Sequence, residues 1–317
     1  MSKVWFLTLA LLVCARPGGA AAPPAGPSTS GGDLRYTVFL GNVRVGAATL
    51  HAGPDGEAVV NLKLSDRGRG QDLTSQLRLD PAGVPLQEHL TGVDYWRNPV
   101  DERFELAGGK AAWSGGTDKG EKKVSAPAFY ITRDGSYIEI GLLAMALLQS
   151  PGHKLPLLPE GEARIESVAT AKAEAGGKTR EVSLYALYGI TAVPLYVWMD
   201  NPRLFFGRYD GWTTVVPEGW EEAMPALLKV QAQAMAARER ALAAKLSHRP
   251  ARALAIQGAR LFDPETRTVR PHTTVVVSGN RIQAVGPDGE VPVPPGAEVV
   301  EAQGKTLLPG LWDMHQH

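Results

Sequence analysis

Short runs in which apolar and polar residues alternate cover much of the chain, and they restrict it to few folds. Four such runs, each followed by turn-forming residues, occupy residues 35–40, 43–50, 58–64 and 73–79. Successive side chains on a strand point to opposite faces, so a run of this kind fits a strand with one buried face. Runs joined by short turns favour antiparallel neighbours. The sequence therefore predicts an antiparallel meander.

One segment within this pattern has helical spacing instead. Residues 138–149 have apolar side chains three and four positions apart, at Leu142, Leu143, Ala146 and Leu147. Alternating runs then resume at residues 163–173, 180–188, 194–199 and 204–209. We therefore predict a mostly β, antiparallel domain over residues 33–216, with one helix inserted in it.

A change in composition marks the end of this domain. Residues 220–246 are rich in alanine, glutamate, glutamine, leucine, lysine and arginine, which lose little entropy in a helix. Pro250 follows, and proline does not continue a helix. The sequence therefore predicts a connecting helix within residues 217–250.

Aromatic residues gather near the end of the predicted β domain. They are Tyr185, Tyr188, Tyr196, Trp198, Phe205, Phe206, Tyr209 and Trp212. An antiparallel sheet with one buried face has this composition, because aromatic side chains pack well on a pleated surface. Packing in the core is therefore the favoured interpretation, and a pocket for an apolar ligand is the alternative.

The charge of the chain excludes some partners. Lysine plus arginine number 33 and aspartate plus glutamate number 33, so the totals give no basic excess for binding nucleic acid. Small molecules or proteins are the expected partners. The acidic pairs Asp101-Glu102 and Glu221-Glu222 are interpreted as solvated charge, because adjacent side chains diverge on a strand and on a helix.

The beginning of the chain has the pattern of a secretory signal peptide. Lys3 precedes an apolar run at residues 4–15, and small residues follow at 18–22. The apolar run is shorter than the roughly 20 residues that cross a bilayer, so we expect no stable membrane span. The sequence predicts a signal peptide over residues 1–20 and a periplasmic or secreted mature protein.

Two consequences follow for the mature chain. Residues 21–32 (AAPPAGPSTSGG) contain almost nothing that can be buried, so they are predicted to form a flexible linker. The single cysteine, Cys14, lies within the predicted signal peptide. The mature protein would then have no disulfides, thiol nucleophiles or cysteine metal ligands.

The last part of the chain, residues 251–317, combines strands with a histidine pair. Strands are predicted at residues 254–262, 273–277 and 281–285, with a hairpin turn at Ser278-Gly279-Asn280. The segment GKTLLPGLWDMHQH then ends at His315 and His317. Alternate residues of a strand share a face, so the two imidazoles point the same way and can bind one divalent ion such as zinc.

This order of parts resembles the start of the amidohydrolase superfamily, most closely its imidazolonepropionase-like and prolidase-like branch. The resemblance implies that residues 251–317 form the leading strands of a β-sandwich and the start of the first strand of a (β/α)8 barrel. It implies that His315 and His317 bind zinc or another divalent metal. It further implies hydrolysis of amide or cyclic amide C–N bonds by metal-activated water, with a small molecule or a dipeptide as substrate.

The resemblance stops at His317. A (β/α)8 barrel needs about 250 residues, so the catalytic barrel is expected to be absent from this chain. The expected function is that of a truncated exported amidohydrolase, incomplete and inactive as given. The alternative is a non-enzymatic exported β domain that binds an apolar ligand or a protein partner.

Cleavage of the signal peptide can be tested directly. Expression in a host with a secretory pathway is expected to give an exported protein whose first residue is Ala21, because a cut after Ala22 would place Pro23 next to the scissile bond. Mass spectrometry of the exported fraction measures this N-terminus. A protein that starts at Met1 or Ser2 in that fraction would contradict the prediction.

Overall fold

The computed structural model divides into two compact units, a first unit of residues 1–237 and a second unit of residues 238–317. The predicted signal peptide (1–20) and linker (21–32) lie outside the described residues. The described residues are 33–116, 118–202, 204–210, 212–311 and 313.

The first unit is built on one long antiparallel sheet, as the alternating pattern predicts. Its strands are β1 (Leu34–Leu40), β2 (Val43–Ala52), β3 (Glu57–Leu64), β4 (Asp72–Leu79), β5 (Pro85–Val93), β6 (Pro99–Ala107), β7 (Lys110–Gly115), β8 (Asp118–Lys123), β9 (Phe129–Tyr130), β10 (Lys154–Leu158), β11 (Glu162–Ala175), β12 (Lys178–Tyr188), β13 (Leu195–Asn201), β14 (Leu204–Tyr209) and β15 (Thr213–Pro217). The mostly β fold class is confirmed, and the described residues contain no (β/α)8 barrel.

Two meanders make up this sheet. Strands β1 to β8 pair in sequence order, and so do β10 to β15. The two meanders are joined where β1 pairs antiparallel with β15, with Val38 opposite Val215. The short strand β9 pairs in parallel with β10 and lies at the far edge. The pairing of β1 with β15 therefore turns two local meanders into one continuous sheet.

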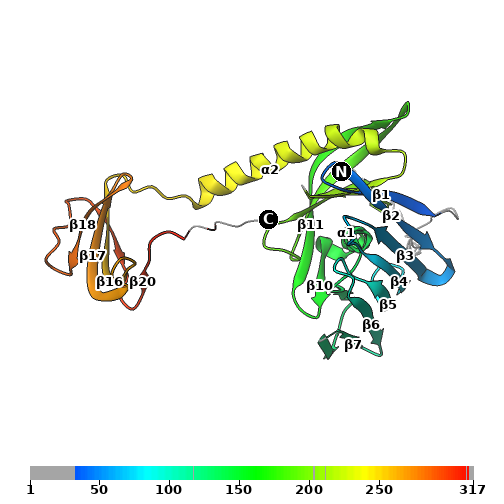
Figure 1. Ribbon diagram of the computed structural model, residues 1–317, viewed down its shortest axis with the longest axis horizontal. Helices are drawn as coiled ribbons and strands as arrows, with labels where there is room; N and C mark the ends of the chain where they lie inside the picture. Colours follow the sequence, from blue (N-terminus) through cyan, green and yellow to red (C-terminus); the bar gives the residue numbers. More distant parts are fainter. Residues whose placement is uncertain (1–32, 117, 203, 211, 312, 314–317) are drawn as a thin grey trace, which may run out of the picture. The chain divides into compact units, whose positions relative to one another are not determined.

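Helix α1 (Tyr137–Gln149) confirms the helix predicted between the two meanders. It begins after Ser136, whose backbone N–H donates to Glu139 Oε1 at 3.0 Å, and it is followed by the short 3-10 helix η2 (Pro151–His153). Ile138, Leu143 and Leu147 are at most 1% exposed, so the helix is buried on more than one side. A helix that is apolar all round must be enclosed. Figure 1 shows α1 within the curve of the sheet.

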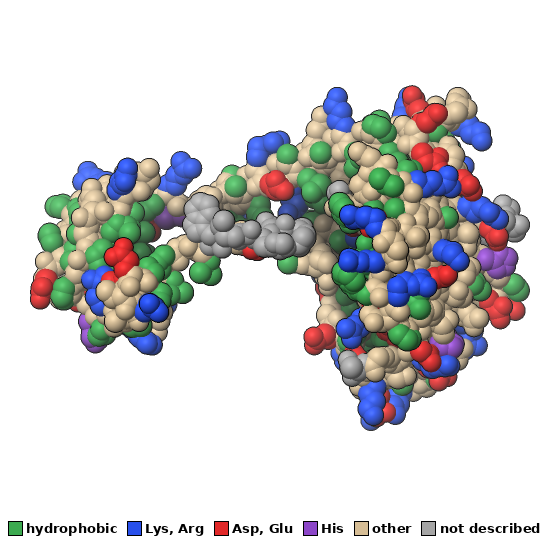
Figure 2. All heavy atoms as spheres, viewed as in Figure 1, with side chains coloured by type: hydrophobic (Ala, Val, Ile, Leu, Met, Phe, Trp, Pro, Cys, Tyr) green, Lys and Arg blue, Asp and Glu red, His purple; other side chains and the backbone are tan. Residues whose placement is uncertain are grey.

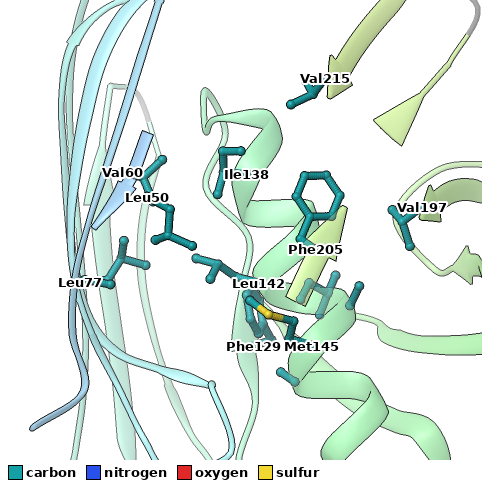
Figure 3. Close-up of a cluster of buried hydrophobic side chains, with 14 of the residues drawn as sticks. Leu50, Val60, Leu77, Phe129, Ile138, Leu142, Met145, Val197, Phe205 and Val215 are labelled. Atoms are coloured by element: carbon teal, nitrogen blue, oxygen red, sulfur yellow. The ribbon is translucent and has the colours of Figure 1, made fainter. Parts of the chain in front are cut away.

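The main core lies between α1 and the two meanders. Leu50 and Leu77 come from the first meander, and Figure 3 shows them pointing toward Leu142 of α1. Phe205 and Val215 come from the second meander and belong to the same cluster. Helix α1 therefore holds both halves of the sheet together by burying apolar surface against each.

A second helix covers the other face of the second meander. Helix α2 (Met224–Leu246) follows the 3-10 helix η3 (Glu221–Ala223) and confirms the predicted helical segment. Leu227 of α2 is fully buried in a cluster with Trp198 and Phe206. As a result, β13 is buried on both faces. The alternating pattern of its sequence predicts a strand with one buried face. Of the described helices, none is long and apolar enough to cross a membrane.

Side chains connect the two edges of the long sheet. The Phe104 ring on β6 stacks on Tyr130 of β9, with ring centroids 4.4 Å apart and an interplanar angle of 2°. The Tyr130 hydroxyl donates to Glu102 Oε1 at 2.6 Å, and Lys122 Nζ donates to the Pro159 carbonyl at 3.2 Å. These contacts bring strands from opposite ends of the sheet together without backbone pairing between them.

The second unit is a smaller sheet. Its strands are β16 (Ala253–Asp263), β17 (Thr268–Ser278), β18 (Arg281–Pro287), β19 (Glu298–Glu301) and β20 (Thr306–Leu307). The predicted hairpin is confirmed, since Ser278 pairs with Arg281 across the turn. Strands β19 and β20 both pair in parallel with β16.

The core of the second unit is small. Its buried apolar residues are Ala253, Ala255, Ala259, Val275, Val276 and Ala302, whereas Ile282 and Val299 are 67% and 45% exposed. Hydrophobic side chains are visible on the face of this unit that Figure 2 presents. The unit therefore leaves much of its apolar surface open to solvent.

Close packing around α1 gives a test of the first unit. A Cβ added at Gly141 would lie 2.5 Å from the ring of Phe205, which is 2% exposed. We expect Gly141→Ala to lower the free energy of unfolding by roughly 1–3 kcal/mol, despite the better helix propensity of alanine. Urea denaturation measures the change.

A second background distinguishes this clash from other effects of the substitution. In a Phe205→Ala protein the Cγ and Cδ2 atoms that crowd the added methyl group are gone, so Gly141→Ala should cost less there than in the parent. Equal or greater stability of Gly141→Ala in the parent protein would show that Phe205 does not set the need for glycine.

Candidate functional site

The predicted metal ligands His315 and His317 lie outside the described residues. The described chain leads toward them through β20, which pairs in parallel with β16, and then through Asp313, which is exposed. Among the described residues, no group of three or more histidine, cysteine, aspartate or glutamate side chains is placed to hold a metal ion. The metal site therefore stays a prediction.

The five other histidines lie in separate places. Three contact carboxylates at the surface, in the pairs His51–Asp33 (2.7 Å), His89–Asp101 (3.0 Å) and His248–Glu298 (2.6 Å). His153 Nδ1 lies 3.3 Å from the carbonyl oxygen of Leu147, and His272 is in a left-handed backbone conformation with a φ of 48°. These contacts are those of surface residues rather than of a shared site.

A cavity of about 530 Å³ opens in the first unit between α1 and the sheet. Apolar side chains form its walls, among them Tyr36, Leu50, Leu79, Leu142, Met145 and Phe205. They come from β1, β2, β4, α1 and β14, so the enclosure of α1 by the sheet creates this space. Its volume is within the range of about 300–1,000 Å³ that is typical of small-molecule sites.

The aromatic residues noted in the sequence divide between core and cavity. Phe205 lines the cavity, whereas Trp198, Phe206 and Tyr209 are at most 1% exposed in the second core beside α2. Gln231 of α2 fixes that core, because its amide accepts from Trp198 Nε1 at 3.2 Å and donates to the Tyr209 carbonyl at 2.7 Å. Trp212, in contrast, is 62% exposed.

Three buried glutamates form a feature that the sequence did not reveal. Glu88, Glu102 and Glu139 are 4%, 7% and 6% exposed, and they come from β5, β6 and α1. The prediction of solvated charge at Asp101-Glu102 is therefore wrong for Glu102. Adjacent residues of a strand face opposite sides, so Asp101 points to solvent while Glu102 points inward.

Each of these carboxylates has hydrogen-bond donors. Ser75 Oγ donates to Glu88 Oε1 at 2.5 Å, and the backbone N–H of Arg133 donates to Glu102 Oε2 at 3.2 Å. Glu139 accepts from Thr132 Oγ1 as well as from the N–H that starts α1. The buried oxygens are thus satisfied by neutral donors, and no positive charge is hydrogen-bonded to them among the described side chains.

Burial changes the acidity of all three groups. Desolvation raises the pKa of Glu139 to about 7, although the hydrogen bonds from Thr132 and Ser136 act in the opposite direction. Burial also raises the pKa of Glu88 well above its usual value, with repulsion from Glu139 adding to the effect. The pKa of Glu102 is raised by burial too. The three groups therefore bind protons more tightly in the folded protein than in the unfolded chain.

Sequence comparison finds short local similarities. The chain is 42% identical over 64 residues to an adenine deaminase of Paracoccus denitrificans, which covers 20% of this chain and 11% of that protein. It is 54% identical over 48 residues to an imidazolonepropionase of Rubrobacter xylanophilus, which covers 14% of this chain and 12% of that protein. The matches thus span about a tenth of the length of these relatives. They support a loose relation to hydrolases of the amidohydrolase superfamily.

Other comparisons add little. No family model matches the chain. Among solved structures, a β-barrel-like protein of a domain of unknown function from Brucella abortus has a TM-score of 0.39 and 10% sequence identity, over 58% of this chain and 94% of that one.

The buried carboxylates predict how stability depends on pH. The pKa of Glu139 is about 7 in the folded protein, against an ordinary value of 4.5 in the unfolded chain. Folding is therefore most favourable at low pH, where the carboxyl group is protonated in both states. The free energy of unfolding should therefore decrease as the pH rises from 4.5 to 7 and then level off. Glu139→Gln should flatten this decrease and raise stability at pH above 7 relative to the parent.

Urea denaturation at a series of pH values measures this dependence. Glu174→Gln is a matched control, because Glu174 is exposed on β11 and should leave the slope unchanged. Glu88 and Glu102 also titrate, so some slope will remain in Glu139→Gln. Identical slopes for Glu139→Gln and the parent would show that Glu139 is not the group responsible.

Proposed function

We propose that the second unit is the leading part of a metal-dependent hydrolase of the amidohydrolase superfamily. The observation that carries this proposal is the local similarity to an adenine deaminase and an imidazolonepropionase, over 20% and 14% of the chain. The order of β16, the β17–β18 hairpin, β20 and the turn at Pro309-Gly310 agrees with it.

In this proposal His315 and His317 are the first two metal ligands. Imidazole suits zinc, and a bound zinc ion supplies a hydrolytic nucleophile by lowering the pKa of water to roughly 7. A catalytic zinc site usually has three protein ligands, so two histidines do not complete one. The reaction is the hydrolysis of a C–N bond, with a small molecule or dipeptide as substrate, in a periplasmic or secreted protein, and this chain by itself is inactive.

The cavity favours a second candidate function for the first unit. A hollow of about 530 Å³ with apolar walls fits a non-enzymatic domain that binds an apolar ligand. This function does not depend on the metal site, because the cavity is formed by residues of the first unit alone. The two candidate functions can therefore be tested separately.

Zinc retention tests the hydrolase proposal. After dialysis, the 317-residue chain should hold much less than one zinc ion per protein and should not hydrolyse dipeptides or cyclic amides, since only two ligands are proposed. In a longer protein that carries a (β/α)8 barrel after His317, zinc should be stoichiometric. His315→Ala or His317→Ala should then remove both zinc and activity.

His272→Ala serves as the control, because His272 lies on β17 and has no part in the proposed site. It should leave zinc content and activity of the longer protein unchanged. Stoichiometric zinc together with amide hydrolysis in the 317-residue chain would contradict the proposal.

A further inference from the structure

The two polar side chains at the walls of the cavity already have hydrogen bonds within the protein. The Tyr36 hydroxyl donates to the Phe205 carbonyl at 3.0 Å, and Gln149 Nε2 donates to the Met145 carbonyl at 3.3 Å. Leu142 and Met145 of α1 face the space together with Leu50 of β2. Burying a polar group here without a partner would cost free energy, so the walls select an alkyl chain.

The mouth of the cavity, in contrast, is acidic. Asp55, Glu57 and Asp80 line it, and none of the described lysine, arginine or histidine side chains does. Asp55 and Glu57 are exposed, and neither forms an ion pair with another described residue. Arg78 of β4 is the cross-strand neighbour of Glu57, but it does not line the cavity and forms no ion pair with Glu57. The mouth therefore carries a net negative charge.

The backbone holds these three carboxylates at one rim. Asp55 lies in the 3-10 helix η1 (Pro54–Gly56), which connects β2 to β3. A Cβ at Gly56 would lie 2.2 Å from the carbonyl oxygen of Leu79, so only glycine lets this turn pack against the end of β4. Next to it, Asp80 Oδ1 accepts from the backbone N–H groups of Ala82 and Val84, both at 2.8 Å.

Apolar walls below an acidic rim define the chemistry of the occupant. We infer that the cavity binds an amphiphile with one alkyl chain in the cavity and a positively charged head group, such as an ammonium, at Asp55, Glu57 and Asp80. This inference rests on the proposed binding function of the first unit and names its ligand class. A fatty acid is excluded as the preferred ligand, because its carboxylate would meet like charges at the rim.

Three probes with the same alkyl chain test the inference. Decyltrimethylammonium, decyl maltoside and decyl sulfate are titrated into the full chain at low salt, below their micellar concentrations, and binding is measured by calorimetry. The cationic probe should bind with a stoichiometry of one and at least tenfold more tightly than the other two. Octyl and nonyl homologues should lose about fourfold in affinity for each methylene removed.

Two variants assign the binding to this cavity. Asp55→Asn combined with Glu57→Gln should reduce the affinity of the cationic probe to that of the maltoside, which should itself be unchanged. Glu174→Gln combined with Glu181→Gln is the matched control, because these exposed carboxylates on β11 and β12 do not line the cavity. This control should leave all affinities unchanged.

Met145→Trp fills the space and should lower the affinity for each of the three probes at least tenfold. If thermal unfolding shows that this variant does not fold, Leu142→Phe replaces it, since Leu142 lines the same cavity. Equal binding of cationic and neutral probes at this site would overturn the inference and leave the binding function standing. Absence of binding, or binding that neither the rim variant nor the space-filling variant weakens, would overturn both the inference and the proposed binding function.

Discussion

The fold of the first unit depends on the enclosure of α1. Ile138, Leu143 and Leu147 are almost inaccessible to solvent, and a helix with apolar residues on every side has no stable place at a surface. The two meanders satisfy this constraint by pairing β1 with β15 and curving around the helix (Figure 1). The rest of the architecture follows, since strands of the second meander then need α2 to cover their outer face.

The same enclosure produces the two chemical features of this unit. The start of α1 brings Glu139 into the interior with Glu88 and Glu102, where burial raises the pKa of each carboxylate. Farther along the helix, Leu142 and Met145 do not fill the space opposite β2, so a cavity remains there. Buried carboxylates and an unfilled space both cost stability, and protein cores are otherwise close-packed.

The two proposed functions rest on different kinds of observation. For the proposed hydrolase the support is local sequence similarity to an adenine deaminase and an imidazolonepropionase, while the described residues contain no group of three or more potential metal ligands. For the first unit the support is geometric, in the form of a cavity with apolar walls and an acidic rim.

Local patterns were enough to predict β1 to β4, β11 to β14, both α-helices and the hairpin at Ser278-Gly279-Asn280, because each depends on residues close in sequence. They did not single out β5 to β10 or β15. The contiguous segment that leads to His315 and His317 likewise predicts, through its resemblance to the amidohydrolase superfamily, a relation that the short local similarities support loosely. Only the tertiary structure decided that β1 pairs with β15, that Glu102 faces the interior and that Asp55 and Asp80 share one rim. The physical reason is that these features arise from contacts between residues far apart in sequence, for which the local pattern carries no signal.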